Sequence, residues 1–255
     1  MESLERELER ARDLDVSDLA DAIESIGFEC TRCGACCTGD RTGCSEGAND
    51  PDADTEPHTA TVFPDEVRRL ASTTDREWRD VARPMPFGLG SRSDGPAGET
   101  FEWALAVDDC GDCVFYEEVD AGDVPEAPAT DRGDDGRDEV GSCRVHEHRP
   151  LICRTYPFSL ALSGTTQPMG AAVDEAGILR VHECEGLGRD ISREDAVTLA
   201  RTLKRRAVRE LTEAIDLLET YEPHEPEGTS VVVHDSEGPK RPDGTPIDRD
   251  DTGVE

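Results

Sequence analysis

The chain has few aromatic residues, almost no lysine and no long hydrophobic run. Aromatic residues make up 4% of its 255 residues, and its only two lysines are Lys204 and Lys240. The longest uninterrupted apolar run extends only from Trp103 to Val107, whereas a membrane-spanning helix needs about 20 apolar residues. These absences predict a chain with a modest apolar core and no membrane segment.

The first residues, MESLERELER, are acidic and helix-forming, unlike the start of a secretory signal peptide. We therefore expect a cytoplasmic protein, whose ten cysteines serve metal or redox chemistry rather than disulfides. Nucleic acid is not an expected partner, because phosphate binding needs a clustered basic patch. The sequence predicts no membrane contact and leaves any other partner unknown.

Acidic residues outnumber basic ones along the whole chain. The 59 Asp and Glu residues against 27 Lys and Arg residues give a net charge of −32. Carboxylates at this density, with almost no lysine, indicate adaptation to very high salt, where screening weakens repulsion between like charges. An acidic face for a basic partner is the competing interpretation, but the even spread of acids favours a solvated surface, as in a protein of a halophilic organism.

Lowering the salt concentration is expected to destabilise the protein. The Debye length grows from about 3 Å at 1 M salt to about 10 Å at 0.1 M, so uncompensated negative charges repel one another more strongly. Thermal unfolding followed from molar to low salt should show a falling midpoint. A midpoint that stays flat over that range would contradict the inferred adaptation.

Apolar residues at helical spacing predict helices near both ends. Residues 3–26 form one helix or two short ones, which Gly27 ends. A short helix is expected to open at Pro64, and Ser192 with Asp195 predicts a later helix cap. The apolar stripe that follows this cap consists of Ala196, Ala200, Leu203, Ala207, Leu211, Ile215 and Leu218.

The middle of the chain predicts short strands between irregular segments. Residues 101–107 have the pattern of a strand, and residues 167–173 can pair with residues 177–182 as a hairpin. Residues 88–100 are rich in glycine and residues 117–142 are rich in acids, so we expect a loop and a solvated insertion there.

A dense cysteine cluster carries the chemistry. Cys30, Cys33, Cys36 and Cys37 form the run C-x2-C-x2-C-C, and two residues between cysteines let one turn present both sulfurs to one ion, at about 2.3 Å for zinc. A disulfide between the adjacent Cys36 and Cys37 would be strained, so they either point to different sites or share a cluster. The run also matches part of a ferredoxin motif, but incompletely, since Cys37 follows at once and no proline closes it.

Further cysteines lie later in the chain. Cys110 and Cys113 have ligand spacing, and Cys143 and Cys153 lie in an expected loop over residues 141–158. Arg149 and Arg154 flank Cys153, where their guanidinium groups could offset the negative charge of thiolates or simply form salt bridges. Three histidines near cysteines could replace a thiol as ligand, although such histidines are usually exposed: His146, His148 and His182.

Together these motifs resemble the YkgJ-type cysteine cluster family, which has a zinc- or iron-chelating domain. The resemblance rests on FECTRCGACC at 28–37, on C-x9-C with ExRPxxCRxYPF at 143–158, and on CEGLG at 184–188. Cys44 and Cys110 lie outside the family pattern and are expected to be spectators, although Cys110 could compete with Cys113. The resemblance implies a metal-binding core of eight thiols: Cys30, Cys33, Cys36, Cys37, Cys113, Cys143, Cys153 and Cys184.

The sequence therefore predicts an α+β fold, with irregular loops around metal, a short hairpin and helices at both ends. After residue 222, prolines and acids break every pattern, which predicts disorder. The expected parts are an N-terminal helical segment, a cysteine-cluster domain with acidic insertions, a C-terminal helix packed on that domain and a disordered acidic tail, at residues 1–27, 28–190, 191–221 and 222–255.

Several functions remain open at this stage. The first is a metal-binding protein with a structural or delivery role, holding zinc or an iron–sulfur cluster through clustered thiolates. The second is an iron–sulfur oxidoreductase or electron-transfer protein. A cysteine-based methyl or acyl transferase would need one free, activated thiol, which Arg154 beside Cys153 permits. Nothing outside the cysteines indicates a substrate, because no Ser-His-Asp set, phosphate loop or dinucleotide fingerprint is present.

Overall fold

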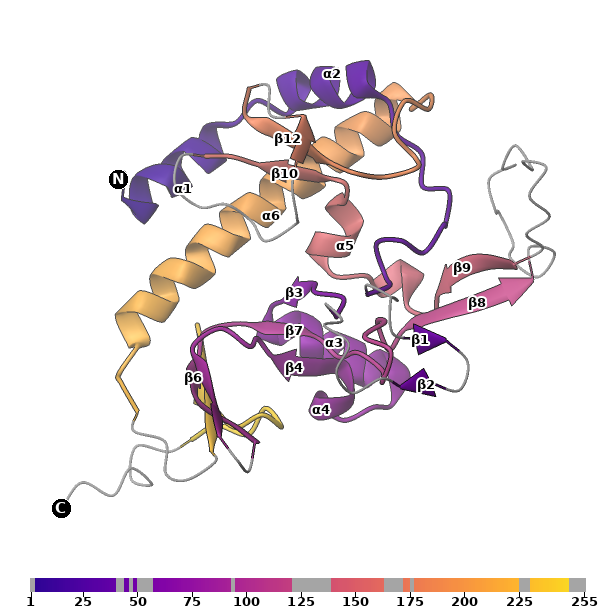
Figure 1. Cartoon of the computed structure of the whole chain (residues 1–255). Helices are drawn as coiled ribbons and strands as arrows, with labels where there is room; N and C mark the ends of the chain where they lie inside the picture. The colour runs from indigo at the N-terminus through magenta and orange to yellow at the C-terminus, as the bar shows by residue number, and fades with distance from the viewer. Residues whose placement is uncertain are drawn as a thin grey trace. The chain divides into compact units, whose positions relative to one another are not determined.

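The protein forms two compact units in the computed structural model (Figure 1). Unit 1 comprises Met1–His58 and Val107–Arg209, and unit 2 comprises Thr59–Ala106 and Glu210–Glu255. Residues 59–106, expected within the cysteine domain, thus belong to unit 2. The structure describes residues 3–39, 44–45, 48–49, 57–92, 95–120, 139–162, 172–174, 177–224 and 230–247.

The N-terminal segment of unit 1 folds as two helices, α1 (Leu4–Asp13) and α2 (Val16–Ile26). The side chain of Asp15 caps α2 by accepting hydrogen bonds from the next backbone amides. Gly27 ends α2 with a positive φ of 76°, which glycine adopts without steric cost. The predicted helix over residues 3–26 is therefore confirmed in its two-helix form.

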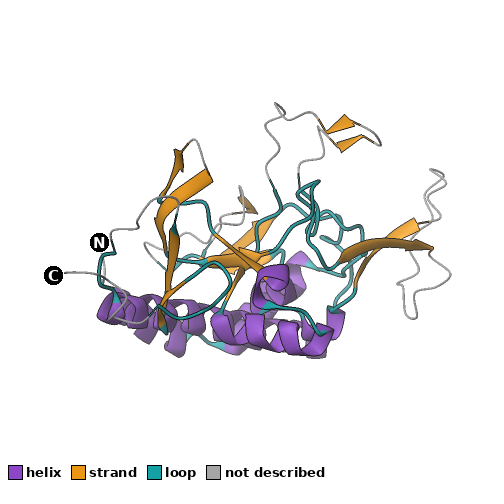
Figure 2. Ribbon diagram, turned by 90° about the horizontal axis from the view of Figure 1, so that it is seen from below, coloured by secondary structure: helices purple, strands orange, loops and turns teal. Residues whose placement is uncertain are grey.

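The first part of α6 (Arg193–Thr220) lies beside these two helices in unit 1 (Figures 1 and 2). Arg193 contacts Asp21 at 2.5 Å and Ser17 at 2.9 Å, and the Lys204 ammonium donates to the Leu14 carbonyl at 2.7 Å. The predicted cap is present, since the Asp195 amide donates to the Ser192 hydroxyl at 3.1 Å. The apolar stripe is buried at Ala196, Ala200, Leu203, Ala207 and Leu211.

The described residues of unit 1 contain three small antiparallel sheets. One has the order β10 (Phe158–Leu160), β12 (Leu179–His182), β11 (Ala172–Asp174), so the predicted hairpin is confirmed in its described part, whereas residues 163–171 lie outside the described residues. A two-stranded sheet joins β1 (Cys44–Ser45) to β2 (Ala48–Asn49).

The third sheet pairs β8 (Tyr116–Asp120) with β9 (Glu139–Cys143). The ends of the expected solvated insertion are therefore strands, while residues 121–138 lie outside the described residues. The expected loop over residues 141–158 is also corrected, because Cys143 ends β9 and α5 (Leu151–Thr155) carries Cys153. A 3-10 helix, His146–His148, precedes α5.

One sheet of unit 2 has the strand order β3 (Thr61–Val62), β7 (Trp103–Leu105), β4 (Ala82–Pro84). The helix predicted at Pro64 is confirmed as α3 (Pro64–Thr74), followed by α4 (Trp78–Val81). Proline at the first helical position suits α3, because that amide has no partner within the helix. The core of this unit includes the fully buried residues Val67, Leu70, Val81 and Trp103.

A second sheet of unit 2 corrects two predictions. Its order is β14 (Gly238–Lys240), β13 (Val231–Asp235), β6 (Gly95–Thr100), β5 (Leu89–Arg92). Residues 89–92 and 95–100 thus pair as antiparallel strands rather than forming a loop, and Gly95 and Gly98 both have positive φ. The C-terminal part is not a disordered tail where it is described, because Val232 and Val233 are buried in β13.

These units confirm the predicted α+β fold, since helices pack with small, mostly antiparallel sheets. The parallel pairing is that of β13 with β6, in a sheet whose other pairs are antiparallel. Within the described ranges, no helix combines the length and apolar composition that crossing a membrane requires.

Candidate metal centre

The segment after α2 forms a tight cysteine turn. Gly34 has a positive φ of 81°, and the Cys37 amide donates to the Gly34 carbonyl at 2.7 Å. This turn places the sulfurs of Cys36 and Cys37 at 3.8 Å from one another. Two thiolates on one tetrahedral zinc ion also lie about 3.8 Å apart, given Zn–S bonds of about 2.3 Å. Cys30 and Cys36 are exposed, so solvent reaches this side of the cluster.

Backbone hydrogen bonds bring Cys113 and Cys143 to this turn. The Cys113 amide donates to the Cys37 carbonyl at 2.8 Å. Cys143 lies opposite Tyr116 in the β8–β9 pair, and the Tyr116 amide donates back to the Cys113 carbonyl at 2.8 Å. The Gly141 amide of β9 donates to the Arg32 carbonyl at 2.9 Å, which fixes the strand against the turn.

Cys184 reaches the cluster through a separate set of contacts. Phe28 and Leu187 form an antiparallel bridge, and the Glu29 amide donates to the Gly186 carbonyl at 3.0 Å. The sulfur of Cys184 in turn accepts a hydrogen bond from the Gly186 amide at 3.4 Å. These contacts hold the CEGLG segment against the residues that lead into Cys30.

Two glycines permit these close approaches. A Cβ atom at Gly141 would lie 2.9 Å from the Arg32 carbonyl oxygen and from backbone atoms of Gly34. At Gly186 it would overlap the carbonyl oxygen of Glu29. Because the opposing atoms are backbone, neither contact can be relieved by a side-chain rotation.

Replacing Gly186 by alanine is expected to weaken metal binding. The added methyl group must push the CEGLG segment away from Glu29. This displacement moves Cys184 away from the thiols of the Cys30–Cys37 segment. We expect a loss of about tenfold or more in metal affinity, as for changes that misplace metal ligands. Metal per chain, measured against a competing chelator, tests this. Gly90→Ala is the matched control, since its Cβ would meet only an ordinary contact at 3.7 Å. Equal affinity in both variants would contradict the expectation.

The pKa values of the thiols identify a first set of neighbours. Burial raises the pKa of Cys153 well above its usual value, and the thiolates of Cys113, Cys36 and Cys143 raise it further. Burial likewise raises the pKa of Cys113 to about 11, with Cys143 and Cys36 as its charged neighbours. The guanidinium of Arg149 acts in the opposite direction on Cys153, as expected for a cation beside thiolates.

A second set of thiols surrounds Cys184. Burial raises the pKa of Cys184 to about 11, and its charged neighbours are Cys33, Cys36 and Cys30. Burial also raises the pKa of Tyr156 to about 12, assisted by Cys184, Cys36 and Cys33. Cys36 therefore interacts with both sets, and its own pKa is raised chiefly by the hydrogen bond with Cys37. A metal ion would reverse these shifts, because coordination stabilises the thiolate.

The eight residues predicted as ligands are all free thiols. Cys110 differs, because it is disulfide-bonded, so the expectation that the cysteines form no disulfide is wrong for this residue. The side chain of Cys44 lies outside the described residues. Among the described residues, no three cysteine sulfurs lie within 4.8 Å of one another, so the thiols are gathered but not at the spacing of a bound ion.

The three histidines near the cysteines have other contacts. His182 is buried, and its Nε2 lies 2.8 Å from the Ser159 hydroxyl. His146 lies 3.7 Å from the carboxylate of Glu147, and burial lowers its pKa. His148 is exposed. Sequence reasoning missed the positioning glycines Gly141 and Gly186, since only the three-dimensional structure reveals which backbone each one faces.

The comparisons with known proteins agree with the geometry of this centre. No curated protein and no solved structure matches the chain. One family model does match, over residues 29–185, which contain all eight free thiols. Its description is "putative zinc- or iron-chelating domain". Because this match covers more than half of the chain, the protein belongs to the CxxCxxCC family of zinc- or iron-chelating domains.

Proposed function

We propose that the protein binds two zinc ions through its eight free thiols, which hold the segments of unit 1 together. The observation that carries this proposal is the backbone contacts that bring the later cysteine segments to the cysteine turn: the Cys113 amide donates to the Cys37 carbonyl, and the Glu29 amide donates to the Gly186 carbonyl beside Cys184. The charged neighbours of Cys153 and of Cys184 support a division of the thiols between two ions. Cys113, Cys143 and Cys153 supply three ligands to one ion. The second ion takes three from Cys30, Cys33 and Cys184. The Cys36–Cys37 pair completes both coordination shells, because each zinc ion needs four thiolates.

The donor set suits zinc in two respects. Thiolates are soft ligands that favour zinc or iron–sulfur clusters over hard cations such as magnesium. The 3.8 Å separation of the Cys36 and Cys37 sulfurs equals the edge of a tetrahedral zinc–thiolate site. Positive charge near the thiolates helps to offset the charge of such a site, and Arg149 provides it at Cys36, Cys143 and Cys153.

Purification without oxygen, followed by elemental analysis and an absorption spectrum, tests this function. We expect two zinc ions per chain and no visible absorption band. Iron with matching inorganic sulfide and a broad visible absorbance would instead indicate an iron–sulfur cluster and favour the electron-transfer alternative. A chain that carries neither metal after this purification and that takes up none on addition would refute the proposal.

Removing the metal is expected to unfold much of unit 1. Its thiols come from five segments that are far apart in the sequence, so coordination cross-links these segments and supplies part of the folding free energy. Circular dichroism and thermal melting in high salt, before and after verified removal by a chelator, measure the effect. Restoring zinc should restore the melting midpoint. An unchanged midpoint in the metal-free protein would contradict this coupling.

A further inference from the structure

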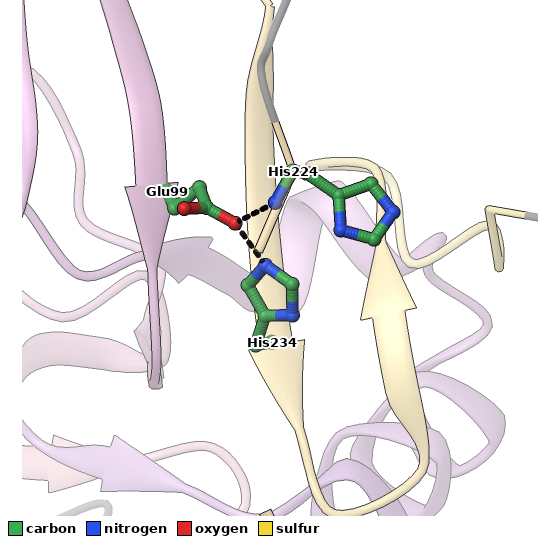
Figure 3. A group of neighbouring side chains, drawn as sticks. All are labelled: Glu99, His224 and His234. Atoms are coloured by element: carbon green, nitrogen blue, oxygen red, sulfur yellow. Dashed lines mark hydrogen bonds and ion pairs between the residues drawn. The ribbon is translucent and has the colours of Figure 1, made fainter. Parts of the chain in front are cut away.

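A second group of metal-ligand residues lies in unit 2 and contains no cysteine. Glu99, His224 and His234 each offer one ligand atom, and these atoms all lie within 4.8 Å of one another. Figure 3 shows the carboxylate of Glu99 directed at His234, with one ring nitrogen of His224 facing the same space. In the described part of the chain, no other three His, Cys, Asp or Glu residues meet this spacing.

The pairing of two strands explains how Glu99 and His234 meet. β6 and β13 run parallel, with Glu99 opposite Val232. Side chains two residues apart point to the same face of a sheet, so Val232 and His234 share the face of Glu99. The Nε2 of His234 consequently lies 2.7 Å from Oε1 of Glu99, although 135 residues separate them in sequence.

His224 arrives from the segment that follows α6. Its backbone amide donates to Oε1 of Glu99 at 2.7 Å, which anchors the segment at the strand. Its Nδ1 lies 2.9 Å from the carbonyl oxygen of Glu222. Since a carbonyl oxygen only accepts, Nδ1 carries the proton in this state. The third contact to the carboxylate comes from the Tyr221 hydroxyl, 3.3 Å from Oε2.

Aromatic rings enclose the group on one side. Phe101 stacks on His234 with ring centroids 5.6 Å apart, and Tyr221 meets His234 edge-on at 4.9 Å. His234 is 1% exposed, whereas Glu99 and His224 are half-buried. His234 is therefore fixed by its packing, whereas Glu99 and His224 remain partly accessible to solvent.

We propose that Glu99, His224 and His234 form a binding site for one divalent first-row transition-metal ion, best suited to Zn²⁺. Imidazole is a ligand for zinc, copper, iron and nickel, and a carboxylate completes the two-histidine, one-carboxylate sets that leave coordination positions open. Three protein ligands with an open position suit an ion that exchanges with solvent, unlike a closed four-thiolate site. The site stands on unit 2 alone and does not depend on the proposed thiolate centre.

Binding requires a shift of one proton and a small approach of the three side chains. Without metal, Nε2 of His234 donates a hydrogen bond to Glu99, and Nδ1 of His224 donates one to the Glu222 carbonyl. The ion takes Nε2 of His234 as its proton moves to Nδ1 of the same ring, and it takes an unprotonated ring nitrogen of His224, so each imidazole stays neutral. The Glu99 carboxylate exchanges its hydrogen bond from His234 for a bond to the ion.

The test is a titration of the full-length chain with Zn²⁺, followed by nitrogen NMR of the six histidine rings. We expect the ring-nitrogen signals of His224 and His234 to shift together and to saturate with one ion. The rings of the other four histidines report any binding elsewhere, including at the thiols. Shifts confined to those four rings, or no shift of His224 and His234 at millimolar Zn²⁺, would overturn the proposal.

Variants separate a metal site from a hydrogen-bonded cluster. Glu99→Gln retains a side chain that can accept from the His224 amide but loses the charge, and His224→Ala removes a half-buried ligand. In each variant, the Zn²⁺ concentration that half-saturates the shift of the remaining rings should rise by about tenfold or more. Glu77→Gln, an exposed carboxylate of the same unit, is the matched control and should bind as the unaltered chain does. Equal affinity in Glu99→Gln, which keeps the fold, would also overturn the site.

Discussion

Replacing Cys153 by serine is expected to reduce bound metal from two ions per chain to about one. Cys153 lies among Cys113, Cys36 and Cys143, so its loss leaves one ion with three thiolates. A hydroxyl is a poor substitute, because soft thiolates dominate this donor set. Cys33→Ser should have the same effect on the other set, which includes Cys184. Elemental analysis of the anaerobically purified variants measures the number of metal ions per chain directly.

Cys110→Ser is the matched control for these variants. Cys110 is disulfide-bonded and is not among the eight free thiols, so its replacement should leave the metal content unchanged. Cys44→Ser should behave in the same way if Cys44 is a spectator, as the sequence predicts. Full retention of metal in Cys33→Ser or Cys153→Ser would refute the division into ligands and spectators. Loss of metal in Cys44→Ser would refute it as well.

Replacing Asp235 by alanine is expected to destabilise unit 2 by about 3–5 kcal/mol, the usual cost of breaking a buried ion pair. Both carboxylate oxygens of Asp235 lie 2.6 Å from the Lys240 ammonium, and these side chains are 6% and 5% exposed. Asp235 also accepts a hydrogen bond from the indole of Trp103 at 2.8 Å. The variant thus leaves a buried donor without this acceptor and a buried ammonium without its closest carboxylate.

Chemical denaturation of the variant measures this effect. Glu219→Ala serves as control, because Glu219 is an exposed residue near the end of α6 in the same unit. We expect the control to unfold within about 0.5 kcal/mol of the unaltered protein. The Lys240 ammonium also donates to Glu237, at 2.9 Å. A loss of stability well below 3 kcal/mol in Asp235→Ala would contradict the expectation and mean that Glu237 alone can balance the charge of Lys240.

The helices were the most predictable part of the fold. Their apolar residues recur at helical spacing, and local signals such as Gly27 and the Ser192 cap mark their ends. These signals lie within a few residues of one another, so the sequence alone contains them. The strand Trp103–Leu105 was equally accessible, since it coincides with the longest apolar run.

The sheet of β13 and β6 was not predictable in the same way. β6 contains three residues that usually break strands, Gly95, Pro96 and Gly98, and it gains its order from pairing with distant residues. The acidic, proline-rich surroundings of β13 favour disorder when they are read alone. Long-range pairing therefore overrides local composition in both strands. For the same reason, nothing local links Glu99 with His224 and His234.

The thiols of the candidate metal centre can be named from the sequence, but their arrangement cannot. Cysteine spacing and the family resemblance name the eight thiols. They do not reveal that Cys113 joins the turn through the Cys37 carbonyl, or that Cys184 approaches through Gly186. Those contacts depend on backbone geometry, which no spacing rule specifies. The division into two sets consequently required the structure.

The parallel pairing of β6 with β13 has a consequence for synthesis on the ribosome. β6 ends at Thr100 and β13 begins at Val231, so 231 − 100 = 131 positions separate them. At about 5–20 residues per second, roughly 7–26 s pass between the emergence of the two strands. During that interval one edge of the β5–β6 hairpin stays unpaired and open to other strands. The strong negative charge of the chain opposes the pairing of this edge with neighbouring chains during that time.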